Sequence, residues 1–162
     1  MRAWRGVRLL GLSLGLLLGA CSARFDRPQA EAEAPLDAIR QAIVLEALGQ
    51  IGRPYRYGGE TPDGFDCSGL VRHAYRQAGL TVPRTTREQH AAGRPVPLDR
   101  LRPGDLLFYR FGGSGKIDHV ALYLGDGEAV HAPASGKSVI VAPVASPYWM
   151  ARYVDAVSLL DP

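Results

Sequence analysis

The stretch Phe65-Asp66-Cys67-Ser68-Gly69-Leu70 marks the point at which a glycine-rich loop ends and a helix with a regular apolar face begins. Asp66 is placed to cap this helix and Gly79 to end it. A thiol in the first turn, as at Cys67, faces unpaired backbone N–H groups and the positive end of the helix dipole, which favour thiolate over thiol. The stretch therefore predicts a nucleophile, whereas the alternative is a buried structural cysteine, the usual state of a free Cys.

Composition predicts a single globular domain. The chain has 162 residues, of which 46% are hydrophobic and 22% charged. Its formal net charge is +3, but three of the 19 basic residues lie in the first twenty residues, which contain no acidic residue. The remainder carries 16 basic and 16 acidic side chains. Electrostatic binding to nucleic acid is therefore not expected.

The first twenty residues have the order of an export signal: arginines, a short apolar run and small residues. The apolar run is shorter than the roughly 20 residues of a membrane span. Leu18-Gly19-Ala20-Cys21 resembles a bacterial lipobox, which implies cleavage before Cys21 and attachment of acyl chains such as palmitate. Ser22 after the cysteine implies the periplasmic face of the outer membrane. An ordinary secretory signal with an incidental cysteine is the alternative.

The chain is predicted to have three parts: a signal peptide over 1–20, a lipidated flexible tether over 21–35 and a folded domain over 36–162. The tether contains two prolines and no aliphatic side chain larger than alanine after Cys21. A lipidated Cys21 cannot pair with Cys67, so no disulfide is expected.

Within the domain, apolar spacing predicts helices first and strands afterwards. Helices are expected from Leu36 to Gly49, from Cys67 to Gly79 and, with capping-box spacing, from Thr86 to Gly93. The polar spacing around His73 and His90 places both histidines at the surface. Strands are expected over 105–109, 119–124, 129–132, 139–141 and 153–157. This order indicates an α+β fold with N-terminal helices packed on an antiparallel β-sheet.

A thiolate nucleophile needs an imidazole to take its proton and a third group to fix the imidazole tautomer. His119 and His131 lie on neighbouring predicted strands. A two-residue turn at Asp126-Gly127 would place them on opposite faces, whereas a three-residue loop over 125–127 would set His131 opposite Ala121 and on the face of His119. The second arrangement predicts a G1 bulge with a left-handed Gly127.

Six motifs between about Gly52 and Tyr153 resemble, in order, those of the NlpC-type cell-wall cysteine peptidases, and most closely the murein endopeptidase lipoproteins of outer membranes. The resemblance implies a circularly permuted papain-like fold that cleaves peptidoglycan stem peptides or cross-links. The motifs are Tyr55-Arg56-Tyr57-Gly58-Gly59, Phe65-Asp66-Cys67-Ser68-Gly69-Leu70, Pro83-Arg84-Thr85-Thr86 with Gln89, Pro103-Gly104-Asp105-Leu106, His119-Val120-Ala121-Leu122-Tyr123-Leu124-Gly125 and Val130-His131-Ala132.

By motif position, the resemblance implies that Cys67 is the nucleophile, His119 the general base and acid, and His131 the orienting residue. If His119 reaches Cys67, the two are expected to rest as thiolate and imidazolium, because each charge stabilises the other. Zinc bound by these three residues is a further alternative. No metal or other cofactor is expected.

Three more residues match family positions. Tyr55 matches a tyrosine near the thiol and, with the Cys67 backbone N–H, would form the oxyanion hole. Asp66 and Ser68 match positions that contact substrate in some members, although both also suit the start of a helix. The loop over 111–118 departs from the family pattern and is flexible by composition, so we expect it to shape the rim of the cleft.

The expected partners are peptidoglycan stem peptides and, through Cys21, a membrane. The competing function is a catalytically idle, peptidoglycan-binding lipoprotein of the same fold, against which the intact Cys67, His119 and His131 argue. The bond remains open between D-Glu–diaminopimelate within a stem and D-Ala–diaminopimelate in a cross-link.

Overall fold

A computed structural model describes residues 28–113 and 115–160, with side chains from residue 35 onward. The helices are α1 Pro28–Leu48, α2 Cys67–Gln77, α3 Thr86–Ala92 and α4 Pro147–Met150, with a 3-10 turn η1 over Leu98–Arg100. The strands are β1 Glu60–Thr61, β2 Gly64–Phe65, β3 Arg94–Pro95, β4 Leu106–Tyr109, β5 His119–Gly125, β6 Glu128–His131, β7 Ile140–Pro143 and β8 Tyr153–Ser158.

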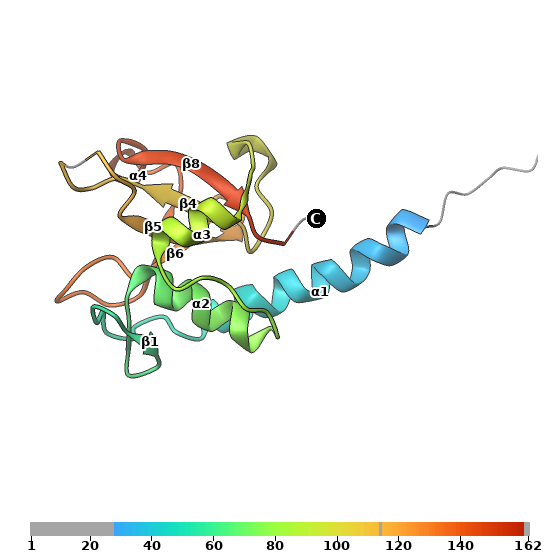
Figure 1. Cartoon of the computed structure of the whole chain (residues 1–162), viewed down its shortest axis with the longest axis horizontal. Helices are drawn as coiled ribbons and strands as arrows, with labels where there is room; N and C mark the ends of the chain where they lie inside the picture. Colours follow the sequence, from blue (N-terminus) through green and yellow to red (C-terminus); the bar gives the residue numbers. More distant parts are fainter. Residues whose placement is uncertain (1–27, 114, 161–162) are drawn as a thin grey trace, which may run out of the picture.

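An antiparallel sheet in the order β3-β8-β4-β5-β6-β7 forms the centre of the domain, and β1 and β2 form a separate hairpin. Helices α1 and α2 pack together against one side of the sheet (Figure 1). Strand β4 is buried on both faces: Leu106 and Phe108 belong to the core that includes α1 and α2, whereas Leu107 and Tyr109 belong to a second core with Trp149 of α4. This arrangement confirms the predicted α+β class.

Helix α1 begins at Pro28, eight residues before the predicted start at Leu36. It therefore extends into the stretch predicted to be a tether. Residues 29–34 are Gln, Ala and Glu, which are strong helix formers, and the sequence interpretation gave more weight to the flanking prolines. The predicted signal peptide and Cys21 lie outside the described residues. Across 28–113 and 115–160, no helix has the length and apolar character needed to cross a membrane.

A buried ion pair attaches α1 to the sheet. Arg40 Nη1 lies 3.0 Å from Asp105 Oδ1 and donates to the carbonyl of Pro103 at 2.8 Å, and Nη2 donates to Ser158 Oγ at 3.2 Å. The Tyr75 hydroxyl of α2 donates to the carbonyl of Gly104 at 2.7 Å. The segment before β4 is thus the point at which α1, α2 and the sheet are joined.

The caps of α2 follow the sequence, and that of α3 differs by one residue. Asp66 caps α2 by accepting from the backbone N–H of Gly69 at 2.7 Å, and Gly79, with φ of 83°, follows its last turn, as predicted. The N-cap of α3 is Thr85, whose hydroxyl accepts from the Glu88 backbone while the Glu88 carboxylate accepts from the Thr85 backbone. The capping box therefore starts at Thr85 rather than Thr86.

Two histidines predicted at the surface are packed inside or half inside the protein. His73 is buried, with Nε2 3.0 Å from Glu46 Oε1 of α1 and its ring against Phe65. His90 is half-buried, bonded to Asp155 of β8 and packed edge-on against Phe108. The prediction was wrong because α1 covers the face of α2 that carries His73, and β8 covers the face of α3 that carries His90. Both faces appear polar from the sequence of their own helix, and the covering segments are distant in sequence.

The β5–β6 hairpin has the predicted register, but a different local irregularity in the backbone produces it. Leu122 pairs with Val130, and this register, continued by one pair, sets His131 opposite Ala121. Gly127 has a φ of 75°, as predicted, but Asp126 is also left-handed at 50°, so the turn itself has two residues. The register instead shifts between Tyr123 and Gly125, where a bulge supplies the extra residue.

We predict that Arg40→Met lowers the free energy of unfolding by about 3 to 5 kcal/mol, because it leaves Asp105 charged and unpaired in the interior. Urea denaturation measures the change. The control is Arg102→Met, which removes an exposed pair with Asp37, whose side chains are 42% and 56% exposed. That control should cost under about 1 kcal/mol. Equal losses in the two variants would contradict the assignment of Arg40 as the main attachment of α1.

Candidate active site

Cys67 is the first residue of α2 and lies at the base of a cleft of about 430 Å³. It is 8% exposed. The cleft brings together four of the predicted site residues, Tyr55, Asp66, Cys67 and Ser68. Its other lining residues are Tyr57, Gly58, Arg84, Thr85, Thr86, Arg87, Ile117 and Asp118.

The Cys67 sulfur lies against both β5 and α3. Backbone groups of Val120 and Ser68 lie close enough to the sulfur to lower the pKa of the thiol. The hydroxyl of Thr86, in the first turn of α3, lies 3.5 Å from the sulfur. Because Val120 directly follows His119, the start of β5 is held beside the thiol.

His119 and His131 lie side by side, as the hairpin register predicts. Nε2 of His119 is 3.1 Å from Nδ1 of His131, and the two rings are within 4° of parallel. Trp149 of α4 stacks on His131 with 3.8 Å between ring centroids, and Phe111 packs edge-on against His119. His119 is 4% exposed and His131 fully buried. Aromatic packing therefore fixes the orientation of both imidazoles.

The shared hydrogen bond restricts the tautomers of the pair. If His119 is to accept a proton at Nδ1, its Nε2 must carry a hydrogen and donate it to Nδ1 of His131. His131 then carries its own hydrogen on Nε2. Among the described residues this Nε2 has no hydrogen-bond partner. In that tautomer His131 would accept the hydrogen bond and leave Nδ1 of His119 free.

Burial favours the neutral forms of Cys67, His119 and His131. It raises the pKa of the Cys67 thiol, against hydrogen bonds from Thr86 and the backbone that lower it. Burial lowers the pKa of His119 to about 4, and burial with the nearby His119 lowers that of His131 to about 2. We infer a resting thiol and imidazole, contrary to the ion pair expected from sequence, because that expectation counted the helix terminus but not desolvation.

Tyr55 lines the cleft beside Cys67. Burial, together with the nearby Cys67 and Asp66, raises the pKa of its hydroxyl. The hydroxyl therefore keeps its proton over the neutral pH range and is available as a hydrogen-bond donor.

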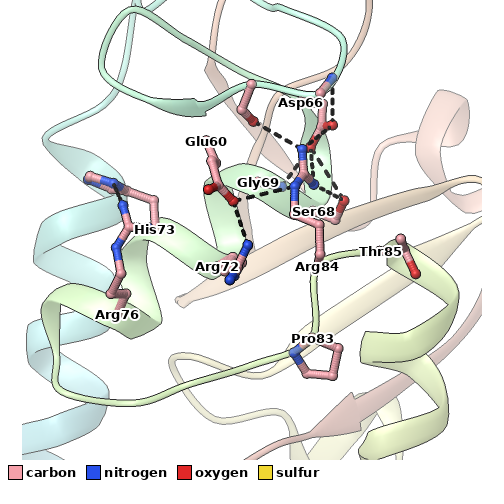
Figure 2. Close-up of polar contacts among 12 residues, drawn as sticks. Glu60, Asp66, Ser68, Gly69, Arg72, His73, Arg76, Pro83, Arg84 and Thr85 are labelled. Carbon is pink, nitrogen blue, oxygen red and sulfur yellow. Dashed lines mark hydrogen bonds and ion pairs between the residues drawn. The ribbon is translucent and has the colours of Figure 1, made fainter.

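Asp66 does more than cap α2, as Figure 2 shows. Arg84 binds it with two nitrogens, Nη2 to Oδ2 at 2.7 Å and Nη1 to Oδ1 at 3.0 Å. Asp66 Oδ2 also accepts from the backbone of Gly58 at 2.9 Å, and Arg84 Nη1 donates to Ser68 Oγ at 3.0 Å. Bidentate pairing of this kind fixes orientation as well as charge. Asp66 and Ser68 are thus joined to the loop before α3.

Glu60 extends this network to the β1–β2 hairpin. Its Oε2 accepts from Arg72 of α2 at 2.8 Å and lies 3.4 Å from Arg84 Nε. Figure 2 shows Arg84 between the two carboxylates. One wall of the cleft is therefore built from three segments of chain that a single arginine connects.

Three residues of the site had no role in the sequence analysis: Arg84, Thr86 and Gln89. Gln89 is fully buried, and its Nε2 donates to the carbonyls of Ser68 at 3.0 Å and Pro83 at 2.9 Å. All three lie in or directly after the motif that begins at Pro83, which marked their importance. Only the packing of α3 on α2 shows what each one contacts.

The loop over 111–118 forms part of the rim, as expected, because Ile117 and Asp118 line the cleft. The Asp118 carboxylate accepts from the backbone of Phe111 at 2.8 Å and Gly112 at 2.6 Å. Within residues 28–113 and 115–160, no group of three or more His, Cys, Asp or Glu side chains is placed to hold a metal ion.

Relatives of similar sequence include proteins named as murein endopeptidases. The chain is 40% identical over 134 residues to Murein DD-endopeptidase MepH of Escherichia coli K12, covering 80% of this chain and 49% of the relative. It is 44% identical over 124 residues to Murein DD-endopeptidase MepS/Murein LD-carboxypeptidase of the same strain, covering 76% of this chain and 64% of the relative. The chain thus spans about half to two thirds of these two proteins.

Solved structures agree with this similarity. An NlpC/P60 family protein from Bacillus cereus superposes with a TM-score of 0.71 at 33% identity, over 75% of this chain and 40% of that one. The NlpC/p60 domain of the peptidoglycan hydrolase SagA superposes with a TM-score of 0.63 at 43% identity, over 74% of this chain and 97% of that one. These matches confirm the predicted papain-like fold.

The NlpC/P60 family description matches residues 52–158, which include the whole cleft and the histidine pair. With a match over most of the chain and relatives at 40% identity or more, the chain belongs to the NlpC/P60 family.

Proposed function

We propose that this protein is a thiol-dependent endopeptidase that hydrolyses amide bonds in peptidoglycan stem peptides or cross-links. The observation that carries the proposal is the 3.1 Å contact between His119 and His131, together with a buried Cys67 that lines a cleft and lies close to Val120, the residue after His119. An idle binding protein has no need of a desolvated thiol with an oriented imidazole next to it. The two relatives whose names include murein endopeptidase support the substrate class.

In the proposed mechanism, neutral His119 takes the proton of the Cys67 thiol as the sulfur attacks the carbonyl carbon. The Tyr55 hydroxyl and the Cys67 backbone N–H donate to the oxyanion that forms. His119 then returns the proton to the leaving amine, which departs and leaves a thioester on Cys67. Water attacks the thioester, His119 takes its proton, and the carboxylic acid is released as the thiol is restored.

His131 assists each proton transfer through His119. Its Nδ1 accepts from Nε2 of His119, so the opposite nitrogen of His119 is free to take the thiol proton. As a neutral acceptor it orients the base without adding a negative charge. This suits a resting thiol, because a buried carboxylate at the same place would raise the pKa of His119 and favour its imidazolium form.

Substrate contact is proposed for the cleft wall around Ser68 and Asp66. Both Asp66 oxygens already accept hydrogen bonds from the protein. Arg84 and Arg87 also line the cleft. Stem peptides carry free carboxylates, which the Arg87 cation suits, whereas Arg84 is already paired with Asp66 and Glu60. Asp66 therefore sets the position of Arg84, and Arg84 in turn positions Ser68 to face the ligand.

We also propose that Cys21 is acylated and anchors the protein to the periplasmic face of the outer membrane. The support is the sequence Leu18-Gly19-Ala20-Cys21 and the serine that follows it. Three acyl chains would give firm anchoring at about 0.8 kcal/mol for each buried methylene. Helix α1 would then connect the anchor to the domain.

Expression of the full chain in a Gram-negative host tests the anchor. The mature protein should begin at Cys21, carry acyl chains by mass spectrometry and sediment with outer membranes. Cys21→Ala should abolish acylation, and Ser22→Asp should move the acylated protein to the inner membrane. A mature chain with an unmodified Cys21 would contradict the proposal.

We expect Cys67→Ala to abolish hydrolysis of purified sacculi, because the nucleophile is lost, with a decrease of at least about 10³-fold in rate. Mass spectrometry of the muropeptides identifies which of the two candidate bonds is cut. Thr81→Val, at an exposed threonine outside the cleft, serves as a control and should retain activity. A Cys67→Ala protein that still digests sacculi would refute a thiol mechanism.

The resting protonation state predicts a steep pH dependence of Cys67 alkylation. Because burial raises the pKa of the thiol, its thiolate fraction and its rate with iodoacetamide should rise about tenfold per pH unit between pH 6 and 8. His119, with a pKa of about 4, stays neutral as pH falls until about that value and then loses its role as base. A rate independent of pH over this range would instead indicate a preformed thiolate–imidazolium pair.

A further inference from the structure

We propose that Thr86 is a further catalytic residue, whose hydroxyl donates a hydrogen bond to the Cys67 sulfur when it becomes a thiolate. The inference rests on the proposed thiol mechanism but not on the identity of the substrate. It assigns to the start of α3 a part in forming the nucleophile.

The geometry places a hydroxyl directly on the reacting atom. Thr86 Oγ1 lies 3.5 Å from Cys67 Sγ, within the range of sulfur hydrogen bonds, and both residues line the same cleft. In the resting thiol either atom can be the donor. A thiolate has no hydrogen, so the Thr86 hydroxyl must donate once the proton has moved to His119.

Because the sulfur is poorly exposed to water, a hydrogen-bond donor beside it would stabilise a thiolate. Cys67 is 8% exposed, so few water molecules can solvate a negative charge there. Backbone groups of Val120 and Ser68 lie close enough to the sulfur to lower the pKa of the thiol, and Thr86 adds a hydrogen bond from a side chain. Hydrogen bonds to a charged group are stronger than those between neutral groups, so the contribution grows as the thiolate forms.

Two devices hold Thr86 in place. The Thr85–Glu88 capping box fixes the first turn of α3, and Gln89 joins that turn to the carbonyl of Ser68 in α2. Gln89 is therefore a positioning residue that keeps the Thr86 hydroxyl at the sulfur. Its other bond, to the carbonyl of Pro83, fixes the loop that carries Arg84.

The hydrogen bond serves one stage of the reaction. As the proton passes from Sγ to the free ring nitrogen of His119, the Thr86 O–H turns toward the sulfur. When the sulfur bonds to the carbonyl carbon, its charge moves to the oxyanion and the hydrogen bond to sulfur weakens. Thr86 thus lowers the free energy of the thiolate without stabilising the thioester that follows.

Thr86→Val tests the inference, because valine keeps the shape of threonine and removes the hydroxyl. At pH 7 the alkylation rate of Cys67, followed on its own peptide by mass spectrometry, should fall about tenfold, and the pH profile should move up by about one unit. Thr86→Ser should retain most of the rate. Thr81→Val is the matched control and should behave as the unmodified protein.

The results of these variants either support or overturn a role for the Thr86 hydroxyl. An unchanged profile in folded Thr86→Val, or a loss in Thr86→Ser as large as in Thr86→Val, would overturn the role of the hydroxyl. If Thr86→Val does not fold, as judged by circular dichroism, Thr86→Ala against Thr86→Ser gives the same comparison. Digestion of sacculi is scored separately: an unmodified protein that leaves sacculi intact contradicts the proposed substrate, whereas the alkylation result still decides Thr86.

Discussion

The register of the β5–β6 hairpin is the constraint on which the site depends. Side chains alternate along a strand, so a one-residue slip would turn His131 to the other face of the sheet. The bulge between Tyr123 and Gly125 supplies the residue that a two-residue turn lacks. It brings His131 within 3.1 Å of His119. Without this local irregularity the protein would keep its sheet and lose the contact between His119 and His131.

Burial of Cys67 and both histidines is the second physical property of the site. The two histidines are enclosed by Trp149 and Phe111, and desolvation moves Cys67 and both imidazoles toward their neutral forms. A charge that appears during reaction must then be stabilised by fixed groups rather than by water. This explains why hydrogen-bond donors gather around the sulfur and why the Arg84–Asp66 pair holds the cleft wall rigid.

Polar contacts connect the helices both to the core sheet and to the cleft. Arg40 attaches α1 to Asp105, and the neighbouring Gly104 carbonyl receives the Tyr75 hydroxyl of α2. Cys67, at the opposite end of α2, is therefore connected through this helix to the same junction as the sheet that carries His119. Gln89 completes the arrangement by joining α3 to the first turn of α2.

Local spacing, capping residues and motif order predicted the fold class, the start and end of α2, Cys67 as the candidate nucleophile and the two histidines to test with it. The sequence also predicted the register correctly, but it placed the bulge at Gly127, whereas the register shifts between Tyr123 and Gly125. The tertiary structure was needed to show that His73 and His90 are covered, that Arg84, Thr86 and Gln89 contact other residues of the cleft, and that burial raises the pKa of the Cys67 thiol. Each of these depends on segments distant in sequence, whose contacts and desolvation no local pattern records.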